Sequence, residues 1–166
     1  MNARCKRTSH ILALAIVTLC AIPRAVTAQT PAPRLTLADA LSIISAGQQA
    51  ANDNRLRVSV AVVDVRGDLI AVVRMPGAGA ATPDTAIGKA MLSAIYGQPS
   101  AALVQRSTSP ITQGLNEATG GRFRFLQGAV PIARGGFTVG AVAASGATAQ
   151  QDEDIVKAAL AGAMLP

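Results

Sequence analysis

The sequence predicts a single α/β (α+β) domain whose sheet is largely antiparallel and is covered on both faces. Three observations lead to this class. The chain has 166 residues, of which 50% are hydrophobic and 14% charged, which suits one folded domain and excludes a disordered chain. Helical and strand patterns follow one another in the order α-β-β-α-(α)-β-β-β-α. The strands are apolar at both parities, whereas an antiparallel pair normally has one solvated face.

Residues 1–28 have the features of a secretory signal peptide. Arg4, Lys6 and Arg7 precede an apolar run over 11–22, which is too short to span a bilayer comfortably. We expect cleavage after Ala28, a periplasmic or secreted bacterial protein, and no stable membrane anchor afterwards. The alternatives are an uncleaved anchor and, less favoured because Leu19 precedes the cysteine, a lipoprotein attached at Cys20.

Cleavage changes the chemistry that the chain can offer. It removes four basic side chains and no acidic ones, which leaves eleven basic and nine acidic groups and a net charge of +2. The charge argument for a nucleic-acid partner therefore disappears. Cys5, Cys20 and His10 are removed as well, so the mature chain has neither cysteine nor histidine. Disulfides, thiol catalysis, Cys/His zinc sites, triads with a histidine base and histidine-ligated haem are excluded.

The mature chain is expected to begin with an extended, proline-stiffened segment over 29–35, followed by one domain over 36–166. Thr36 is the predicted N-cap of the first helix, with Asp39 at the third helical position as in a capping box. The turn-like residues 52–54 are expected to end that helix.

Two strands are predicted next, over 57–65 and 69–75, joined by a tight turn at Arg66-Gly67-Asp68. Both strands are apolar on both faces. Helices or a partner subunit are therefore expected to cover the sheet.

A loop of small residues over 76–81 leads to a helix over 82–96, in which Thr82 is the predicted cap and Pro83 occupies the first position. Both sides of this helix are weakly polar. The stretch 100–122 is compatible with helix or loop.

The C-terminal part is predicted to hold short strands over 123–126, 130–133 and 137–144. A last helix is expected to begin at Thr148, an N-cap with Gln151 at its third position.

Five segments together resemble the GlcG/HbpS-like family, which is also described as haem-degrading or haem-binding. They are Leu35–Ala40, Val60–Leu69, Ala86–Ala90, Gly128–Ile132 and Val139–Glu153. The resemblance covers about residues 35–165, and the Gly-Lys-Ala helix together with the Ser-Gly-Ala-Thr ending is distinctive.

This resemblance implies a profilin-like fold with a five-stranded, mainly antiparallel sheet flanked by helices, and a homo-oligomer. Some relatives bind haem or a corrinoid, and several are secreted. The family commonly has Gly-Gly-Val-Pro-Ile where this chain has Gly128-Ala129-Val-Pro-Ile.

Lys89, the single lysine of an apolar helix, is the main candidate for binding a ligand carboxylate or acting as a base. The alternative is a lysine that reaches solvent or pairs with Asp64 or Asp84. We predict a pocket where the helix over 82–96 meets residues 125–132. The predicted ligand-binding residues are Lys89, Arg74, Tyr96, Phe125, Gly128 and Pro131.

Tyr96 is the first candidate for ligating haem iron, and Met75 and Met91 come second, although ordinary core packing is the alternative for all three. Two weaker functions are also considered, each with a purely structural role as its alternative. The first is anion binding by Arg122, Arg124, Arg134 or the Gly77–Thr82 loop. The second is cation binding by Asp152, Glu153 and Asp154.

The sequence leaves three functions open. The first is a small-molecule-binding protein, with haem or a related tetrapyrrole as the named ligand. The second is an enzyme acting on a small carboxylated or aromatic compound near Lys89. The third is an oligomeric scaffold without a ligand. No catalytic residue and no metal site are assigned.

Overall fold

The computed structural model describes residues 34–163, so the predicted signal peptide and residues 29–33 of the extended segment lie outside the described part. Elements alternate between helix and strand along the chain. In order, they are α1 (Leu37–Asp53), β1 (Ser59–Asp64), β2 (Leu69–Arg74), α2 (Thr82–Tyr96), the 3-10 helix η1 (Ser100–Thr108), α3 (Pro110–Ala118), β3 (Ala129–Arg134), β4 (Phe137–Ser145) and α4 (Ala149–Gly162).

The described residues form one four-stranded sheet with the order β2-β1-β4-β3 and antiparallel pairing throughout. The α/β class and the antiparallel sheet are therefore confirmed. The fifth strand, predicted over 123–126, is wrong, because these residues are not in a strand. The backbone N–H of Arg124 donates to the carbonyl oxygen of Gly88 in α2, and Phe123 and Phe125 pack beside that helix. This segment therefore pairs with a helix and has no strand partner.

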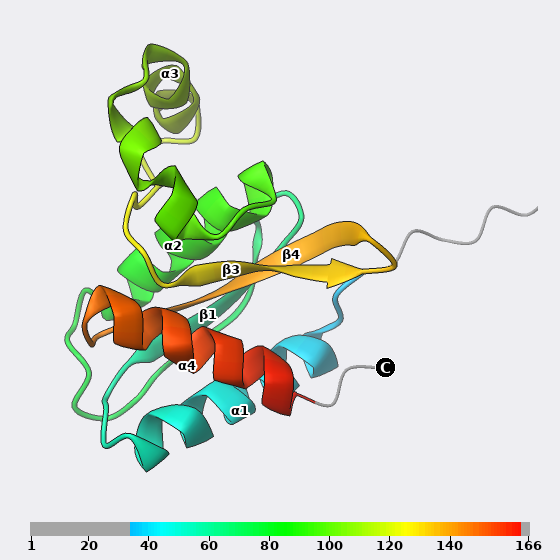
Figure 1. Ribbon diagram of the computed structural model, residues 1–166, viewed down its shortest axis with the longest axis vertical. Coiled ribbons are helices and arrows are strands. Elements are labelled where there is room, and N and C mark those ends of the chain that lie inside the picture. The colour runs from blue at the N-terminus through cyan, green and yellow to red at the C-terminus, as the bar shows by residue number, and fades with distance from the viewer. Residues whose placement is uncertain (1–33, 164–166) are drawn as a thin grey trace, which may run out of the picture. The chain divides into compact units, whose positions relative to one another are not determined.

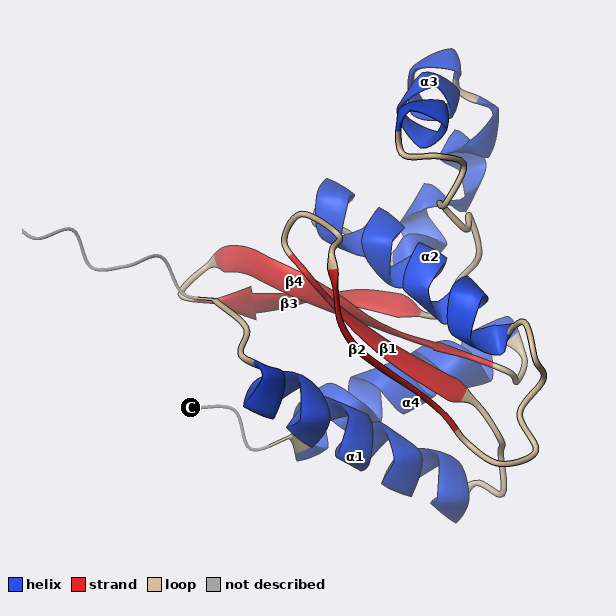
Figure 2. Cartoon of the chain, turned by 180° about the vertical axis from the view of Figure 1, so that it is seen from behind, coloured by secondary structure: helices blue, strands red, loops and turns tan. Residues whose placement is uncertain are grey.

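Helices of the same chain cover both faces of the sheet, as Figures 1 and 2 show from opposite sides. α1 and α4 pack on the face that carries Val60, Val62 and Val142. α2 packs on the other face, against Ala61 and Ala143 among others. Strands that are apolar at both parities are explained in this way, because β1 and the inner part of β4 are buried on both sides.

Local capping chemistry determines where α1 and α4 begin. The Thr36 hydroxyl accepts from the backbone N–H of Asp39 at 3.1 Å, and Asp39 accepts in return from the Thr36 N–H at 2.8 Å. Thr148 and Gln151 form the same reciprocal pair at the start of α4. Both predicted capping boxes are confirmed.

The predicted cap of α2 is wrong. Ala81 precedes the helix and supplies no side-chain cap. The Thr82 hydroxyl instead donates to the carbonyl oxygen of Gly79 and lies 2.7 Å from the Ser59 hydroxyl on β1. Proline near the start of the helix needs no amide partner there, so the helix begins without a side-chain acceptor.

The ambiguous stretch 100–122 consists of η1 and α3. η1 packs on α2 and β3, whereas α3 packs on η1 and lies away from the sheet (Figure 1). Among residues 34–163, no helix is both long and apolar enough to cross a membrane.

Candidate functional site

Lys89 is buried in an ion pair within the chain. Its Nζ lies 2.8 Å from Oδ2 of Asp152 on α4 and donates to the carbonyl oxygen of Ala144 on β4 at 3.0 Å. The side chains of Lys89 and Asp152 are 3% and 4% exposed. A helix on one face of the sheet is thereby tied to a helix on the other face at the end of β4.

The surrounding backbone is shaped for this ion pair. Gly128 has φ +122°, and a Cβ there would lie 2.8 Å from both Nζ of Lys89 and Cβ of Asp152. The second carboxylate oxygen of Asp152 accepts from the backbone N–H of Ala147 at 3.0 Å. The Ser-Gly-Ala-Thr ending and the Gly-Lys-Ala helix, which are far apart in sequence, therefore build one buried polar contact.

The expected partner of Lys89 is corrected by this geometry: it is Asp152, and neither Asp64 nor Asp84. A carboxylate from the same chain occupies the position that we assigned to a ligand carboxylate. A ligand-binding role for Lys89 stays a prediction that requires this ion pair to open. The signal for the true partner was present in the sequence, since a buried lysine needs a carboxylate and Asp152 lies in the distinctive ending.

The other predicted ligand-binding residues are distributed over three parts of the domain. Arg74 lies at the end of the edge strand β2 and donates to the carbonyl oxygen of Ala78 at 2.7 Å. Pro131 lies on the opposite edge strand, β3, paired with Ala141. Phe125 is half-buried and meets Phe123 edge to face, with 6.2 Å between ring centroids. None of these contacts involves Lys89.

Tyr96 lies at the end of α2, where η1 and α3 approach it. Its hydroxyl lies 3.4 Å from the Thr112 hydroxyl on α3, and the guanidinium of Arg106 lies 5.7 Å from its ring centroid. Met75 and Met91 are 4% and 1% exposed, so both thioethers belong to the core. Of the three predicted iron ligands, only the tyrosine is not fully buried.

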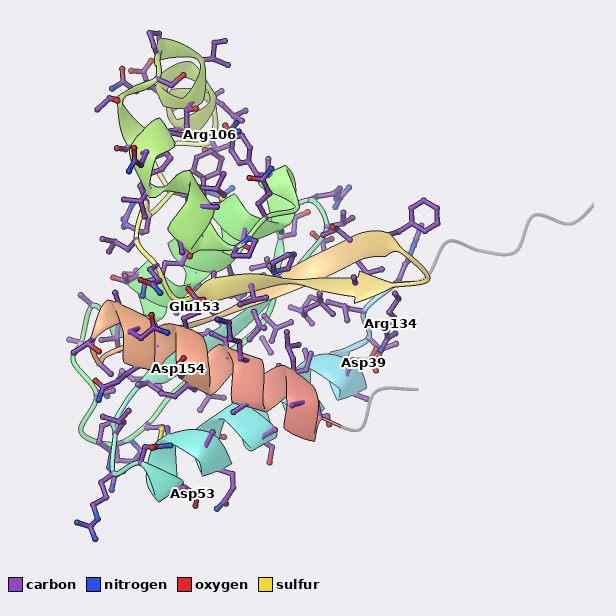
Figure 3. All side chains as sticks on the ribbon, in the orientation of Figure 1. Asp39, Asp53, Arg106, Arg134, Glu153 and Asp154 are labelled. Atoms are coloured by element: carbon purple, nitrogen blue, oxygen red, sulfur yellow. The ribbon has the colours of Figure 1, made fainter. Side chains whose placement is uncertain are left out.

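Arg134 and Asp39 form a second internal ion pair, which the sequence did not reveal. Nη2 of Arg134 lies 2.9 Å from Oδ1 of Asp39, so the β3–β4 hairpin is joined to the start of α1 (Figure 3). The Arg134 guanidinium and the Thr36 N–H lower the pKa of Asp39 from 3.8 to about 2. Arg134 therefore has a carboxylate partner inside the chain, and anion binding by this residue stays a prediction.

The three acids at the start of α4 act separately. Asp152 pairs with Lys89, Glu153 pairs with Lys157 at 2.6 Å, and Asp154 accepts from Gln150 at 2.9 Å. Pairing with Glu153 raises the pKa of Lys157. The structure therefore agrees with the alternative to cation binding, in which Glu153 pairs with Lys157 four residues later on the same helix.

Arg122 and Arg124 donate to backbone carbonyl oxygens close to them in sequence, those of Thr119, Gly121 and Phe123. A shallow groove of about 140 Å³ lies elsewhere, between the end of α1 and the start of α4. It is lined by Ala50, Asn54, Leu56, Gln151, Asp154, Ile155 and Ala158. None of these is among the six predicted ligand-binding residues, and Asp154 is one of the weaker cation-binding candidates.

The fold and the site define a class: an α/β domain with a four-stranded antiparallel sheet between helices, tied across one end by a buried lysine–aspartate pair. A family model described as haem degrading protein HbpS-like matches residues 35–161. The chain belongs to this HbpS-like family, as the resemblance indicated.

Solved structures agree with this assignment. A double mutant of HbpS from Streptomyces reticuli is 30% identical, with TM-score 0.69, covering 85% of this chain and 96% of that one. Protein ORFY from Klebsiella pneumoniae is 26% identical, with TM-score 0.70, covering 82% and 96% of the two chains. A structure described as a complex of PduOC with heme is 24% identical, with TM-score 0.70, covering 81% and 98%. No curated protein matches the sequence.

Proposed function

We propose that this protein binds haem or a related tetrapyrrole in the periplasm or outside the cell. The observation that carries the proposal is membership of the HbpS-like family over residues 35–161, a family described by haem degradation. The heme complex of PduOC supports it as an example of this fold holding the proposed ligand.

The donor atoms of the chain limit how iron would be held. Residues 34–163 contain no histidine and no cysteine, and Met75 and Met91 are buried. Tyr96 offers a phenol at the end of α2, and a phenolate is an established axial ligand of haem iron. If iron is ligated by the described residues, Tyr96 is the proposed ligand.

Export and self-association are further parts of the proposal. Export rests on the signal-peptide features of residues 1–28, and cleavage is proposed after Ala28. Self-association rests on large apolar side chains left at the surface, such as Leu37 at 57% and Phe137 at 71% exposure. Intact mass of protein from the periplasm tests the cleavage site, and retention of residues 1–28 would contradict it.

Titration with haemin tests ligand binding directly. The exported protein should produce a shifted Soret band and, with phenolate ligation, a high-spin ferric spectrum that changes in Tyr96→Phe. An unchanged spectrum in that variant would remove Tyr96 as ligand. Absence of any Soret shift would end the proposal of haem binding.

Degradation is the second candidate function, because the family description names it. The loaded protein, given ascorbate and oxygen, should then lose its Soret band faster than haemin bound to serum albumin. Equal rates would leave binding as the function.

A further inference from the structure

Residues 99–126, called the arm below, form a projection between α2 and β3 that is anchored at its base. Leu103 and Phe123 are buried there, at 0% and 3% exposure. The Ser100 hydroxyl accepts from the backbone N–H of Ala129 at 2.9 Å. The nine-residue helix α3 lies beyond this base and packs on η1 (Figure 1). The arm is thus firmly held at one end and largely solvated at the other.

The arm exposes large apolar side chains. Ile111 is 84% exposed, which is the highest value among the large hydrophobic residues of the described chain. Leu126, Val104 and Leu115 are 51%, 38% and 37% exposed. Ile111 and Leu115 are four residues apart and so share one face of α3. Grouped apolar exposure of this kind is typical of a surface that binds something.

The arm also carries the whole net charge of the described chain. It contains Arg106, Arg122 and Arg124 against the single acid Glu117. The remaining described residues, 34–98 and 127–163, contain eight basic and eight acidic side chains and are therefore neutral in total. A surface that is both apolar and cationic is complementary to an amphiphilic anion.

Tyr96 lies at the base of the same arm. It contacts Thr112 of α3 and lies beneath the guanidinium of Arg106, which Figure 3 labels. The proposed iron ligand, the exposed apolar residues and the excess of arginines therefore all belong to the arm or to its base. The junction around Lys89 and Gly128, by contrast, is filled by the ion pair with Asp152.

We propose that the arm is the docking surface for a flat tetrapyrrole dicarboxylate, with the macrocycle against Ile111 and Leu115 and the carboxylates near the arginines. This inference rests on the proposed function, whose ligand it places. A porphyrin fits both features, since it joins a wide apolar plane to two carboxylates. An anionic membrane surface is the competing occupant, and the experiment distinguishes the two.

The test measures binding of protoporphyrin IX, by fluorescence, and of haemin, by the Soret band, to the exported protein. Ile111→Ser should weaken both by about tenfold, the scale expected from losing one buried aliphatic contact. The matched control is Leu41→Ser, because Leu41 is an apolar residue 49% exposed on α1, on the other side of the sheet. Iron-free porphyrin separates docking on the arm from ligation by Tyr96.

A second pair of variants tests the charges. Arg106→Gln with Arg122→Gln should weaken protoporphyrin IX but leave its dimethyl ester unchanged, because the ester lacks the carboxylates. Arg55→Gln, outside the arm, should change neither. All five substituted positions are exposed, and circular dichroism checks that each variant is folded.

The outcomes separate this inference from the function on which it rests. If porphyrins bind and the arm variants behave like their controls, the arm is not the site, while tetrapyrrole binding stands. If no porphyrin binds, both fall. If the arm variants lose binding to phosphatidylglycerol vesicles and keep porphyrin binding, the arm docks on membranes and the tetrapyrrole placement is wrong.

Discussion

A buried lysine and a buried aspartate stabilise a fold only together. Lys89 and Asp152 are each nearly inaccessible, and removing either leaves the other charge without a partner in the interior. Lys89 also holds the Ala144 carbonyl, and Asp152 also holds the Ala147 amide, so each loss would leave further polar groups unsatisfied.

Lys89→Ala is therefore expected to lower the free energy of unfolding by about 3–5 kcal/mol, the usual cost of breaking a buried pair. The double variant Lys89→Met with Asp152→Leu should have a free energy of unfolding closer to that of the original protein than either of these substitutions made alone. Urea unfolding of the original protein and of each variant measures these free energies. Arg66→Ala, at the exposed ion pair with Asp68, is the control and should show no resolvable change. A small effect of Lys89→Ala would contradict a structural role for the ion pair.

The acid sensitivity of the fold is predicted from Asp39. Its pKa is about 2 in the folded chain against an ordinary value of 3.8, so the folded state favours the charged form. This contribution is fully present above pH 4 and is lost as the pH falls through about 2.

Asp39→Asn should therefore lower stability by about 1 kcal/mol at pH 7, allowing for solvent screening at the helix terminus, and by progressively less below pH 4. Thermal unfolding between pH 7 and 2 measures the difference. A constant difference across that range would show that the Arg134–Asp39 pair does not titrate as described.

At the scale of elements, α2 approaches the arm so closely that one position must lack a side chain. A Cβ at Gly88 would overlap the carbonyl oxygen of Arg122, and Gly88 itself accepts from the Arg124 N–H. The family-like Gly-Lys-Ala sequence thus has two uses: glycine admits the base of the arm, and the following lysine reaches Asp152.

Gly88→Ala is expected to destabilise the protein even though alanine is the better helix former, because the overlap with backbone outweighs the propensity gain. Gly114→Ala in α3 is the matched control. Apart from its chain neighbours and the backbone of its own helix, no atom lies within 4 Å of a Cβ there, so the substitution should stabilise by about 0.5–1 kcal/mol. Hydrogen exchange of residues 122–125 should rise only in Gly88→Ala. Equal effects at both positions would contradict the close approach.

At the scale of the whole molecule, the two-sided apolar sheet does not itself require a partner subunit. The sequence left helices or a partner subunit open, and α1, α2 and α4 of the same chain provide the cover. What still favours self-association is the set of exposed apolar side chains that no helix covers.

Size-exclusion chromatography with light scattering at micromolar concentration should show a mass larger than one chain. Replacing exposed Phe137 and Leu37 together by serine should shift the mass toward the monomer if these residues lie in the interface. A single species of monomer mass before substitution would end the proposal of a homo-oligomer.

Features that depend on neighbours along the chain could be predicted from the residues alone. The capping boxes at Thr36 and Thr148, the turn at Gly67 and the double-sided apolarity of β1 are local, and each was predicted within a few residues of its observed place. Alanine at position 129, where the family commonly has glycine, fits the backbone. The positive φ falls on Gly128, and Ala129 is already in β3.

Contacts between groups far apart along the chain could not be predicted in this way and come from the three-dimensional packing. Phe123–Leu126 has the residues of a strand, yet Arg124 pairs with a helix carbonyl, because the sheet ends at β3. Lys89 could have faced a ligand, and the carboxylate that it contacts is 63 positions further along the chain. The energy of such a pair comes from burial and three-dimensional proximity, and neither is encoded in local spacing.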